Sequence, residues 1–181
     1  AILAQITSNT KIVFIANPNN PTGTWVSHTQ LGQFLAQVPE GVLVVLDEAY
    51  TEYVDEPDFP NGLDFLKEHP NLLVTRTFSK AYGLAGLRVG YSVSSAVIAD
   101  VLNRVRQPFN VNSLALAAAE AALDDSDYLA RSVALNRAGL VQLATGFEHL
   151  KLSYIPSVAN FIAVEVGEHA DKIYQQLLQQ G

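Results

Sequence analysis

The sequence predicts an α/β fold in which a mostly parallel β-sheet is flanked by helices. Two short runs, Lys11–Asn17 and Val42–Tyr50, are continuously apolar, rich in β-branched residues and bounded by turn signals. Runs of this kind are typical of strands that are buried on both faces. Between them, residues 27–38 form an amphipathic stretch that predicts a helix with Ser27 as its N-cap. Strand, helix and strand in alternation indicate an α/β layered domain.

Two further strands are predicted at Leu72–Phe78 and Arg88–Ser94. The interval between them is too short for the helical crossover that joins parallel strands. The strand at Arg88–Ser94 could therefore run antiparallel to its neighbour.

The second half of the chain has a different pattern. An alanine-rich helix is predicted first, then a long helix that begins near Ser126, two strands around a turn, and a final helix; these cover residues 110–125, 125–150, 151–157, 160–167 and 168–180. This order indicates the start of a smaller α+β domain. We expect residues 1–135 to belong to a large domain and residues 136–181 to a small one, with the division inside the long helix.

Composition excludes several classes of protein. The 181-residue chain is 49% apolar and 16% charged, as in globular proteins, and its net charge of −7 comes with scattered basic residues, which argues against nucleic-acid binding. No cysteine is present, so disulfides and thiolate metal sites are excluded, and no metal is expected. The four histidines lack metal-ligand spacing and are interpreted as surface residues: His28, His69, His149 and His169.

The chain contains neither an apolar run long enough to span a bilayer nor a signal peptide, so no membrane association and a cytoplasmic location are expected. It has no methionine, and it opens on a stretch that reads as the end of a helix running into a strand. We therefore expect the chain to be an internal piece of a longer protein.

Polar residues follow the first two predicted strands. "NPNNPTGT" (Asn17–Thr24) is an irregular loop at a strand's carboxyl end, where ligands of open α/β sheets bind, and it could place the Asn20 amide over a ligand or be only a turn. Asp47 ends the next apolar strand and could cap the following segment or pair with a buried cation. Tyr50 follows closely and would lie near Asp47 if the chain turns there.

The third strand leads into "RTFSKAYGLAGLRVGY" (Arg76–Tyr91), which contains Lys80 between a hydroxyl-rich turn and a glycine-punctuated segment. Thr77 and Ser79 supply the hydroxyls, and Arg88 follows the lysine by eight residues. An arginine there can hold a phosphate through two hydrogen bonds. Taken singly, Lys80 could be an ordinary loop lysine and Arg88 a solvated charge.

Together these residues suit a phosphorylated pyridine aldehyde. The lysine can form a Schiff base with the aldehyde. The carboxylate can keep the pyridine nitrogen protonated, which makes the ring an electron sink. The amide and the phenol can hydrogen-bond the ring hydroxyl, while the two hydroxyls and the arginine can hold the phosphate.

At these residues the chain resembles the fold-type I, class I/II pyridoxal-phosphate-dependent aminotransferases. The matching motifs are Asn20-Pro21-Thr22-Gly23, Asp47-x-x-Tyr50, and Ser79-Lys80 with Arg88. "ANPNNPTGT", "DEAYTEY", "FSKAYGLAGLRVGY", "PFNVN" and "PSVANFI" are most similar to the histidinol-phosphate aminotransferases.

The resemblance implies a fold-type I architecture and an activity. The chain would be part of a large, cofactor-binding domain plus part of a small α+β domain. Pyridoxal 5'-phosphate would be held by Asn20, Asp47, Tyr50, Thr77, Ser79, Lys80 and Arg88, with Lys80, Asp47 and Tyr50 acting in catalysis. The reaction would be amino transfer between an amino acid and a 2-oxo acid or an aldehyde, with histidinol phosphate and 2-oxoglutarate as the expected pair in histidine biosynthesis, in a homodimeric enzyme.

The resemblance also implies missing parts. The family's phosphate-binding turn, its ring-stacking aromatic and the tyrosine donated by the partner subunit have no counterpart here, so we expect the isolated chain to bind the cofactor weakly or not at all, without transaminase activity. Its open sheet edge would be covered by another chain. Alternatives within the fold are an aromatic-amino-acid aminotransferase or a phosphothreonine decarboxylase. An alternative of another class is the aminotransferase-like effector-sensing domain of a transcription regulator.

Overall fold

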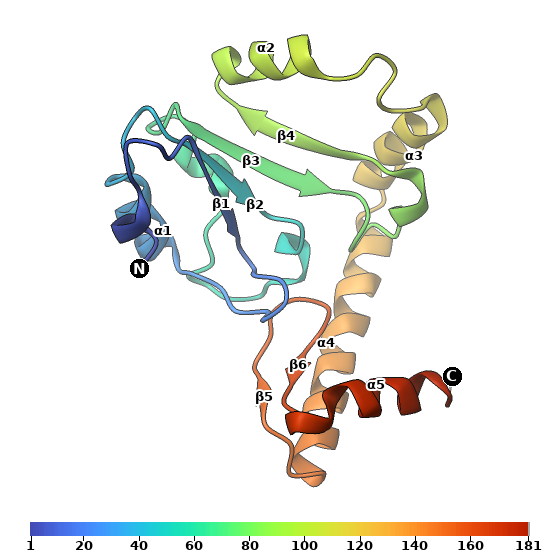
Figure 1. Ribbon diagram of the computed structural model, residues 1–181. Helices are drawn as coiled ribbons and strands as arrows, with labels where there is room; N and C mark the ends of the chain where they lie inside the picture. The colour runs from blue at the N-terminus through green and yellow to red at the C-terminus, as the bar shows by residue number, and fades with distance from the viewer. Residues whose placement is uncertain (181) are drawn as a thin grey trace.

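The computed structural model describes residues 1–180, and its centre is a four-stranded sheet in the order β1-β2-β3-β4 (Figure 1). Strands β1 (Ile12–Ala16), β2 (Leu43–Asp47) and β3 (Leu72–Thr77) run parallel. Strand β4 (Gly90–Ser94) runs antiparallel to β3, with Thr77 opposite Gly90. The predicted parallel sheet and its antiparallel last strand are both confirmed. The carboxyl ends of β1, β2 and β3 and the beginning of β4 consequently share one edge.

Strand β2 is shorter than the run Val42–Tyr50 that the sequence predicted. It ends at Asp47, whose side-chain Oδ1 accepts a hydrogen bond from the Ala49 amide at 3.1 Å. An aspartate that bonds the backbone two residues ahead offers the chain a turn in place of the sheet ladder. The chain therefore turns out of the sheet after Asp47 and enters a 3₁₀ helix at Thr51–Tyr53.

The main hydrophobic core lies between one face of the sheet and helix α1 (His28–Leu35). Ser27 caps α1 as predicted, because its hydroxyl accepts from the Gln30 amide and the Gln30 side chain accepts from the Ser27 amide. Leu31 and Leu35 of the helix pack with Leu46 of β2, and each of these side chains is almost completely buried. Burial of each such leucine contributes about 1.5–3 kcal/mol.

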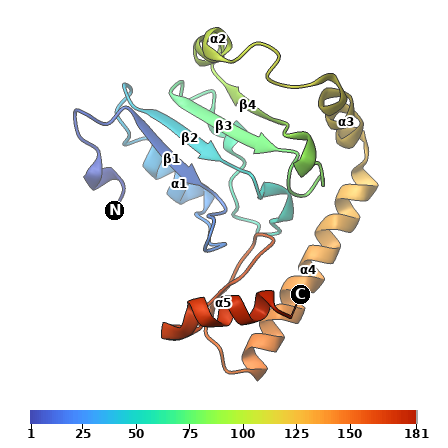
Figure 2. The same ribbon diagram turned by 45° about the vertical axis from the view of Figure 1, so that its right-hand side comes forward.

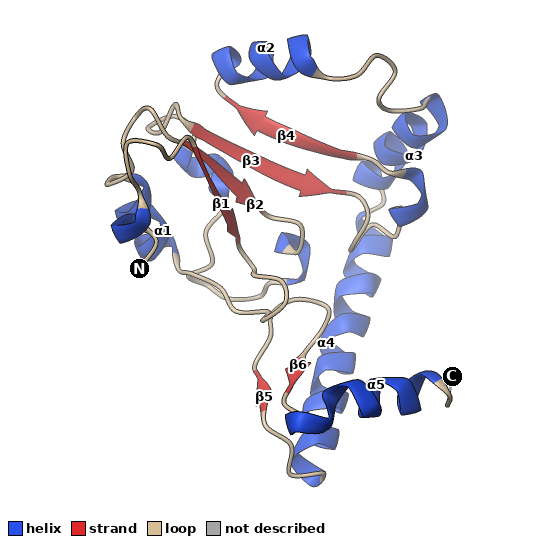
Figure 3. Cartoon of the chain, viewed as in Figure 1, coloured by secondary structure: helices blue, strands red, loops and turns tan. Residues whose placement is uncertain are grey.

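Helix α2 (Ala96–Val105), which follows β4, was not predicted (Figure 3). Its signal was present in the sequence, since Val97, Val101 and Val105 recur at the spacing of one helix face. All three valines are exposed in the structure. The helix thus presents an apolar stripe that no described residue covers.

Helix α3 (Ser113–Asp124) packs beneath the segment that joins β3 to β4. Ala115 and Ala119 of α3 form a second cluster with Phe78 and Val89, which flank the segment that contains Lys80. The small alanines permit this close approach. The cluster therefore anchors both ends of the Lys80 segment to a helix.

Helix α4 (Ser126–His149) begins at Ser126 as predicted and runs from the sheet to the last part of the chain (Figure 2). There β5 (Tyr154–Ile155) and β6 (Ala163–Val164) form an antiparallel pair (Figure 1). These two strands are much shorter than the stretches predicted for them. The final helix is α5 (Ala170–Leu178). Across residues 1–180 there is no helix that combines the length and the apolar character needed to cross a membrane.

Candidate active site

A pocket of about 400 Å³ opens at the edge of the sheet where β2 and β3 end and β4 begins. It is lined by Asp47, Ala49, Thr75, Arg76, Thr77, Ser79, Lys80, Ala85 and Arg88. Five of the predicted site residues thus lie around one cavity, whose volume is in the range of small-molecule sites. A larger pocket of about 530 Å³ lies at the opposite edge of the sheet, lined in part by Lys11, Glu40 and Pro70. That second pocket brings together none of the predicted site residues.

The loop Asn17–Thr24 is held at this edge by its first residue. Asn17 is buried, its amide donates to the Asp47 carbonyl at 2.9 Å, and its side-chain Oδ1 accepts from the Val26 amide at 2.8 Å. Its Nδ2 donates to the Val26 carbonyl at 3.3 Å. A buried amide with all these partners fixes both ends of the loop against β2. Sequence reasoning singled out the loop but did not assign Asn17 this role.

Asn20, Tyr50 and Lys80 form a connected group beside the pocket. The Asn20 Nδ2 donates to the Tyr50 Oη at 2.9 Å, and the Lys80 Nζ lies 5.1 Å from the centre of the Tyr50 ring. A lysine ammonium at this distance from a ring face is attracted by the ring's electrons. Because the phenol oxygen accepts from Asn20, the phenol proton remains available for an acceptor in the site.

Asp47 lies at the tip of β2 with an exposed side chain. Among residues 1–180 its side chain accepts one hydrogen bond, from the Ala49 amide, and Asp47 also lines the pocket. The sequence allowed either a cap for the next segment or a partner for a cation. The structure shows the cap. A role as the partner of a cationic group remains a prediction.

Thr77, Ser79 and Arg88 lie together at the β3–β4 end of the pocket. The Thr77 Oγ1 accepts from the Ser79 amide at 3.1 Å, and the Arg88 Nη1 donates to the Ala85 carbonyl at 2.8 Å. Arg88 adopts a left-handed backbone conformation with φ of 54°. That conformation costs a non-glycine residue about 1–2 kcal/mol and is enriched at functional sites. Hydroxyls and a guanidinium are groups that can bind an anion such as phosphate.

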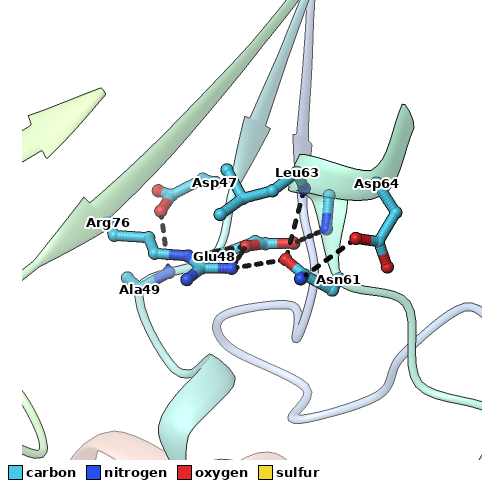
Figure 4. Close-up of polar contacts among 8 residues, drawn as sticks. Asp47, Glu48, Ala49, Asn61, Leu63, Asp64 and Arg76 are labelled. Atoms are coloured by element: carbon cyan, nitrogen blue, oxygen red, sulfur yellow. Dashed lines mark hydrogen bonds and ion pairs between the residues drawn. The ribbon is translucent and has the colours of Figure 1, made fainter. Parts of the chain in front are cut away.

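An ion pair beneath the pocket was not foreseen (Figure 4). Glu48 is fully buried, and its Oε2 accepts from the Nε and Nη2 of Arg76 at 2.9 and 2.7 Å. Its Oε1 accepts from the Gly62 amide at 2.6 Å, while Arg76 also donates to the Asn61 Oδ1 at 2.8 Å. An arginine inside an otherwise apolar strand was the sequence signal for this partner. The pair links the residue that follows Asp47 to strand β3, which leads into the segment that contains Lys80.

Two opposing influences act on the pKa of Arg76. Burial on its own would lower this pKa, but the hydrogen bond and charge of Glu48, together with Tyr91, raise it above its usual value. The guanidinium therefore stays charged, and the ion pair is maintained.

Glu52 adds a second carboxyl group close to this pair. Burial raises the pKa of Glu52 above its ordinary value of 4.5, with Arg76 opposing and Glu48 reinforcing the rise. Within residues 1–180, its Oε2 is buried and has no hydrogen-bond partner. The pKa values of Tyr53 and Tyr82 are raised mainly by burial and also by the negative charge of Glu52. The surroundings thus favour the protonated form of this carboxyl group.

The fold and this residue set define the chain as a member of a cofactor-dependent enzyme class. A family model for aminotransferase class I and II matches residues 1–181, and the chain belongs to that family. It is 65% identical over its full length to histidinol-phosphate aminotransferase 2 of Pseudomonas aeruginosa, of which it covers 49%.

Solved structures agree. A histidinol-phosphate aminotransferase from Sinorhizobium meliloti, crystallised with pyridoxal-5'-phosphate, superimposes with a TM-score of 0.84 at 37% identity, over 90% of this chain and 44% of that one. An L-threonine-O-3-phosphate decarboxylase from Porphyromonas gingivalis superimposes with a TM-score of 0.74 at 27% identity, over 86% of this chain and 48% of that one. The predicted fold-type I architecture is confirmed. The chain spans about half the length of the curated relatives it matches.

Proposed function

We propose that the full-length protein carries out pyridoxal-phosphate-dependent amino transfer, with histidinol phosphate as amino donor and 2-oxoglutarate as acceptor, in histidine biosynthesis. The observation that carries the proposal is the convergence of Lys80, Asp47 and the Asn20–Tyr50 pair at one edge of the sheet. High identity to histidinol-phosphate aminotransferases supports this choice of substrate.

The residues present fit pyridoxal 5'-phosphate by the chemistry of their donors and acceptors. Thr77, Ser79 and Arg88 would hold its phosphate, and the Asn20–Tyr50 pair would bind its ring oxygen. Asp47 would face its ring nitrogen. When bound, the group would supply an aldehyde for an amine and a ring that withdraws electrons from the substrate carbon.

Each protein group then has a defined task. The Lys80 amine would bind the aldehyde covalently and, once displaced by the substrate amine, would carry a proton to and from the substrate carbon. The Asp47 carboxylate would keep the ring nitrogen protonated, since an adjacent negative charge favours the charged form of a cation. The Tyr50 phenol would donate its proton to the ring oxygen, and the Asn20 amide would hold the phenol in place.

Borohydride reduction of the full-length protein with its bound cofactor tests the assignment. Peptide mapping should find the pyridoxyl group on Lys80. A label on Lys67, which is exposed and outside the pocket, or on any other lysine would contradict the proposal. Steady-state turnover of histidinol phosphate with 2-oxoglutarate tests the substrates. Absence of turnover would favour the alternative that the protein is an effector-sensing domain of a transcription regulator.

Phosphothreonine decarboxylation is a second candidate, favoured by the structural similarity to the decarboxylase described above. The cofactor-binding residues do not separate the two reactions, because both would use the same lysine, carboxylate and phosphate site. Carbon dioxide release from threonine phosphate, measured beside amino transfer on the same preparation, discriminates between them.

We also propose a division into two domains within α4, at residues 1–135 and 136–181, and a homodimer as the cytoplasmic form of the protein. The exposed apolar side chains of α2 and α3, among them Val97, Val105 and Leu114, support a covered surface there. The molecular mass of the full-length protein in solution, measured by light scattering, tests the dimer, and limited proteolysis tests the domain division.

A further inference from the structure

The loop between β5 and β6 reaches back to the edge of the sheet that bears the candidate active site (Figures 1 and 2). We call residues 156–161 of this loop the strap. Although the strap follows α4 and lies far along the chain from the site residues, a hydrogen bond ties it to the loop that carries one of them, Asn20. The Val158 amide donates to the Gly23 carbonyl at 3.0 Å, in the same loop as Asn20.

The strap is seated tightly. Gly23 has a φ of 71°, and the side chain of Ser157 occupies the space where a Cβ of residue 23 would lie. Ala159 is fully buried, and its carbonyl accepts from the Asn136 Nδ2 of α4 at 3.0 Å. The strap is therefore braced on one side by the Asn20 loop and on the other by the long helix.

The last residue of the strap contacts a proposed catalytic side chain. The rings of Phe161 and Tyr50 lie edge to face, with centres 5.2 Å apart and planes at 86°. This is a preferred geometry for aromatic pairs. Tyr50 is only 5% exposed, so Phe161 contributes to the packing that encloses its ring. The phenol end is held separately, by the Asn20 Nδ2 at 2.9 Å.

We propose that Phe161 is a positioning residue, which fixes the Tyr50 ring so that its hydroxyl stays aligned with Asn20 and with the ring oxygen of the bound cofactor. The proposal rests on the proposed function. The hydrogen bond from Asn20 restrains only the oxygen of Tyr50, and the torsion of the aromatic ring about its Cβ–Cγ bond has a broad energy minimum. The edge-to-face contact with Phe161 supplies the second restraint, on the ring plane.

A phenol that donates to the cofactor's ring oxygen stabilises the deprotonated form of the bound cofactor. Loosening the phenol weakens that hydrogen bond. The pH midpoint of the cofactor's visible absorption should then rise, and the dissociation constant for pyridoxal phosphate should rise by about two- to tenfold, the factor that corresponds to one aromatic pair.

The test uses Phe161→Leu in the full-length protein loaded with pyridoxal phosphate, with Phe161→Met in case the leucine variant does not fold. We expect a midpoint between those of the wild type and Tyr50→Phe, and recovery in Phe161→Tyr, which keeps the ring. Trp25, the one tryptophan among these 181 residues, lines a pocket together with the strap residues Pro156 and Val158. Its emission, obtained as the difference from a Trp25→Phe background, should stay unchanged if the strap keeps its position.

Phe147→Leu is the matched control, because Phe147 forms a similar aromatic pair with Tyr154 away from the site, at 5.8 Å and 45°. The double variant Phe161→Leu with Tyr50→Phe completes a cycle in which the effect of Phe161 should vanish. The proposal is overturned if the midpoint does not move, moves equally in Phe147→Leu, or still moves in the Tyr50→Phe background. The proposed function fails instead if the wild type loaded with pyridoxal phosphate shows no visible absorption band, or shows one that persists in Lys80→Ala.

Discussion

Arg76 and Glu48 pair in a way that joins the two central strands below the candidate active site. Two nitrogens of the guanidinium, Nε and Nη2, donate to the same carboxylate oxygen at 2.9 and 2.7 Å, and the carboxylate is fully buried. Glu48 directly follows Asp47, the last residue of β2, and Arg76 lies on β3, four residues before Lys80. The ion pair therefore supports Asp47 and the segment that contains Lys80, both of which line the pocket.

Glu48→Ala should lower the free energy of unfolding by about 3–5 kcal/mol, since removing one member of a buried pair leaves the other charge without compensation. Urea unfolding of the full-length protein measures the loss. The control is Asp100→Ala, which breaks the exposed pair with Arg104 and should cost less than about 1 kcal/mol. Equal losses in the two variants would contradict a structural role for the buried pair.

Asp47→Ala should reduce turnover more than it weakens cofactor binding. In the proposed function the carboxylate would act on the electronic state of the ring, while the phosphate would be held elsewhere, by Thr77, Ser79 and Arg88. We expect turnover to fall by more than about a hundredfold, equivalent to about 3 kcal/mol of transition-state stabilisation. Steady-state kinetics and equilibrium cofactor titration give the two quantities, with the exposed Asp58→Ala as control. Near-normal turnover with bound cofactor would refute the assigned role.

Gly83→Ala should destabilise the segment that contains Lys80. Gly83 has a φ of 72°, and a Cβ there would lie 2.5 Å from the Tyr128 hydroxyl. The left-handed conformation alone costs alanine about 1–2 kcal/mol. Gly86→Ala is the control, because a Cβ at that position meets no atom within 4 Å. Thermal unfolding should separate the two, and unfolding temperatures that coincide would count against the need for glycine at position 83.

Glu52→Gln should stabilise the protein at neutral pH but not in acid. The folded-state pKa of Glu52 is raised above 4.5, mainly by burial, so the folded protein holds this proton more tightly than the unfolded chain. The resulting stabilisation is fully present below pH 4.5 and is lost as the pH rises through the folded-state pKa. Glutamine is never ionised and escapes that loss.

The unfolding temperature of Glu52→Gln, relative to the wild type, should therefore increase by a few degrees between acidic and neutral pH. The exposed Glu56→Gln serves as control and should show no such trend. A difference that is constant with pH would mean that the ionisation of Glu52 does not contribute to stability.

The sheet and its polar edge were predictable because both follow from local patterns. Continuous β-branched runs identify buried parallel strands, and the short interval before Arg88 allowed an antiparallel last strand. Once β1, β2 and β3 are parallel, the residues that follow them must meet at one edge, and this brings Asp47, Lys80 and Arg88 around one pocket. Helix α2 is an exception, since the spacing of its valines indicates a helix that the sequence analysis does not predict.

The supporting contacts were not predictable in the same way. Phe161 contacts Tyr50 only because the loop between β5 and β6 returns the chain to the sheet, and no periodic pattern records that path. The partner of Arg76 could have been either Glu48 or Glu52, since both lie in the same short segment. Which of them becomes buried depends on how the chain turns after Asp47.

The order β1-β2-β3-β4 also has a consequence for biosynthesis. Among the described strands each pairs with the one made just before it, so these four strands require no late insertion between existing neighbours. Because domains fold from the N-terminal side as the chain emerges from the ribosome, the edge that holds Lys80 and Arg88 can assemble once β4 has emerged. The contact between the rings of Tyr50 and Phe161 can form only after Phe161 has been translated, much later. The pocket would thus form during translation before its tyrosine is locked, and a pause after β4 would prolong this immature state.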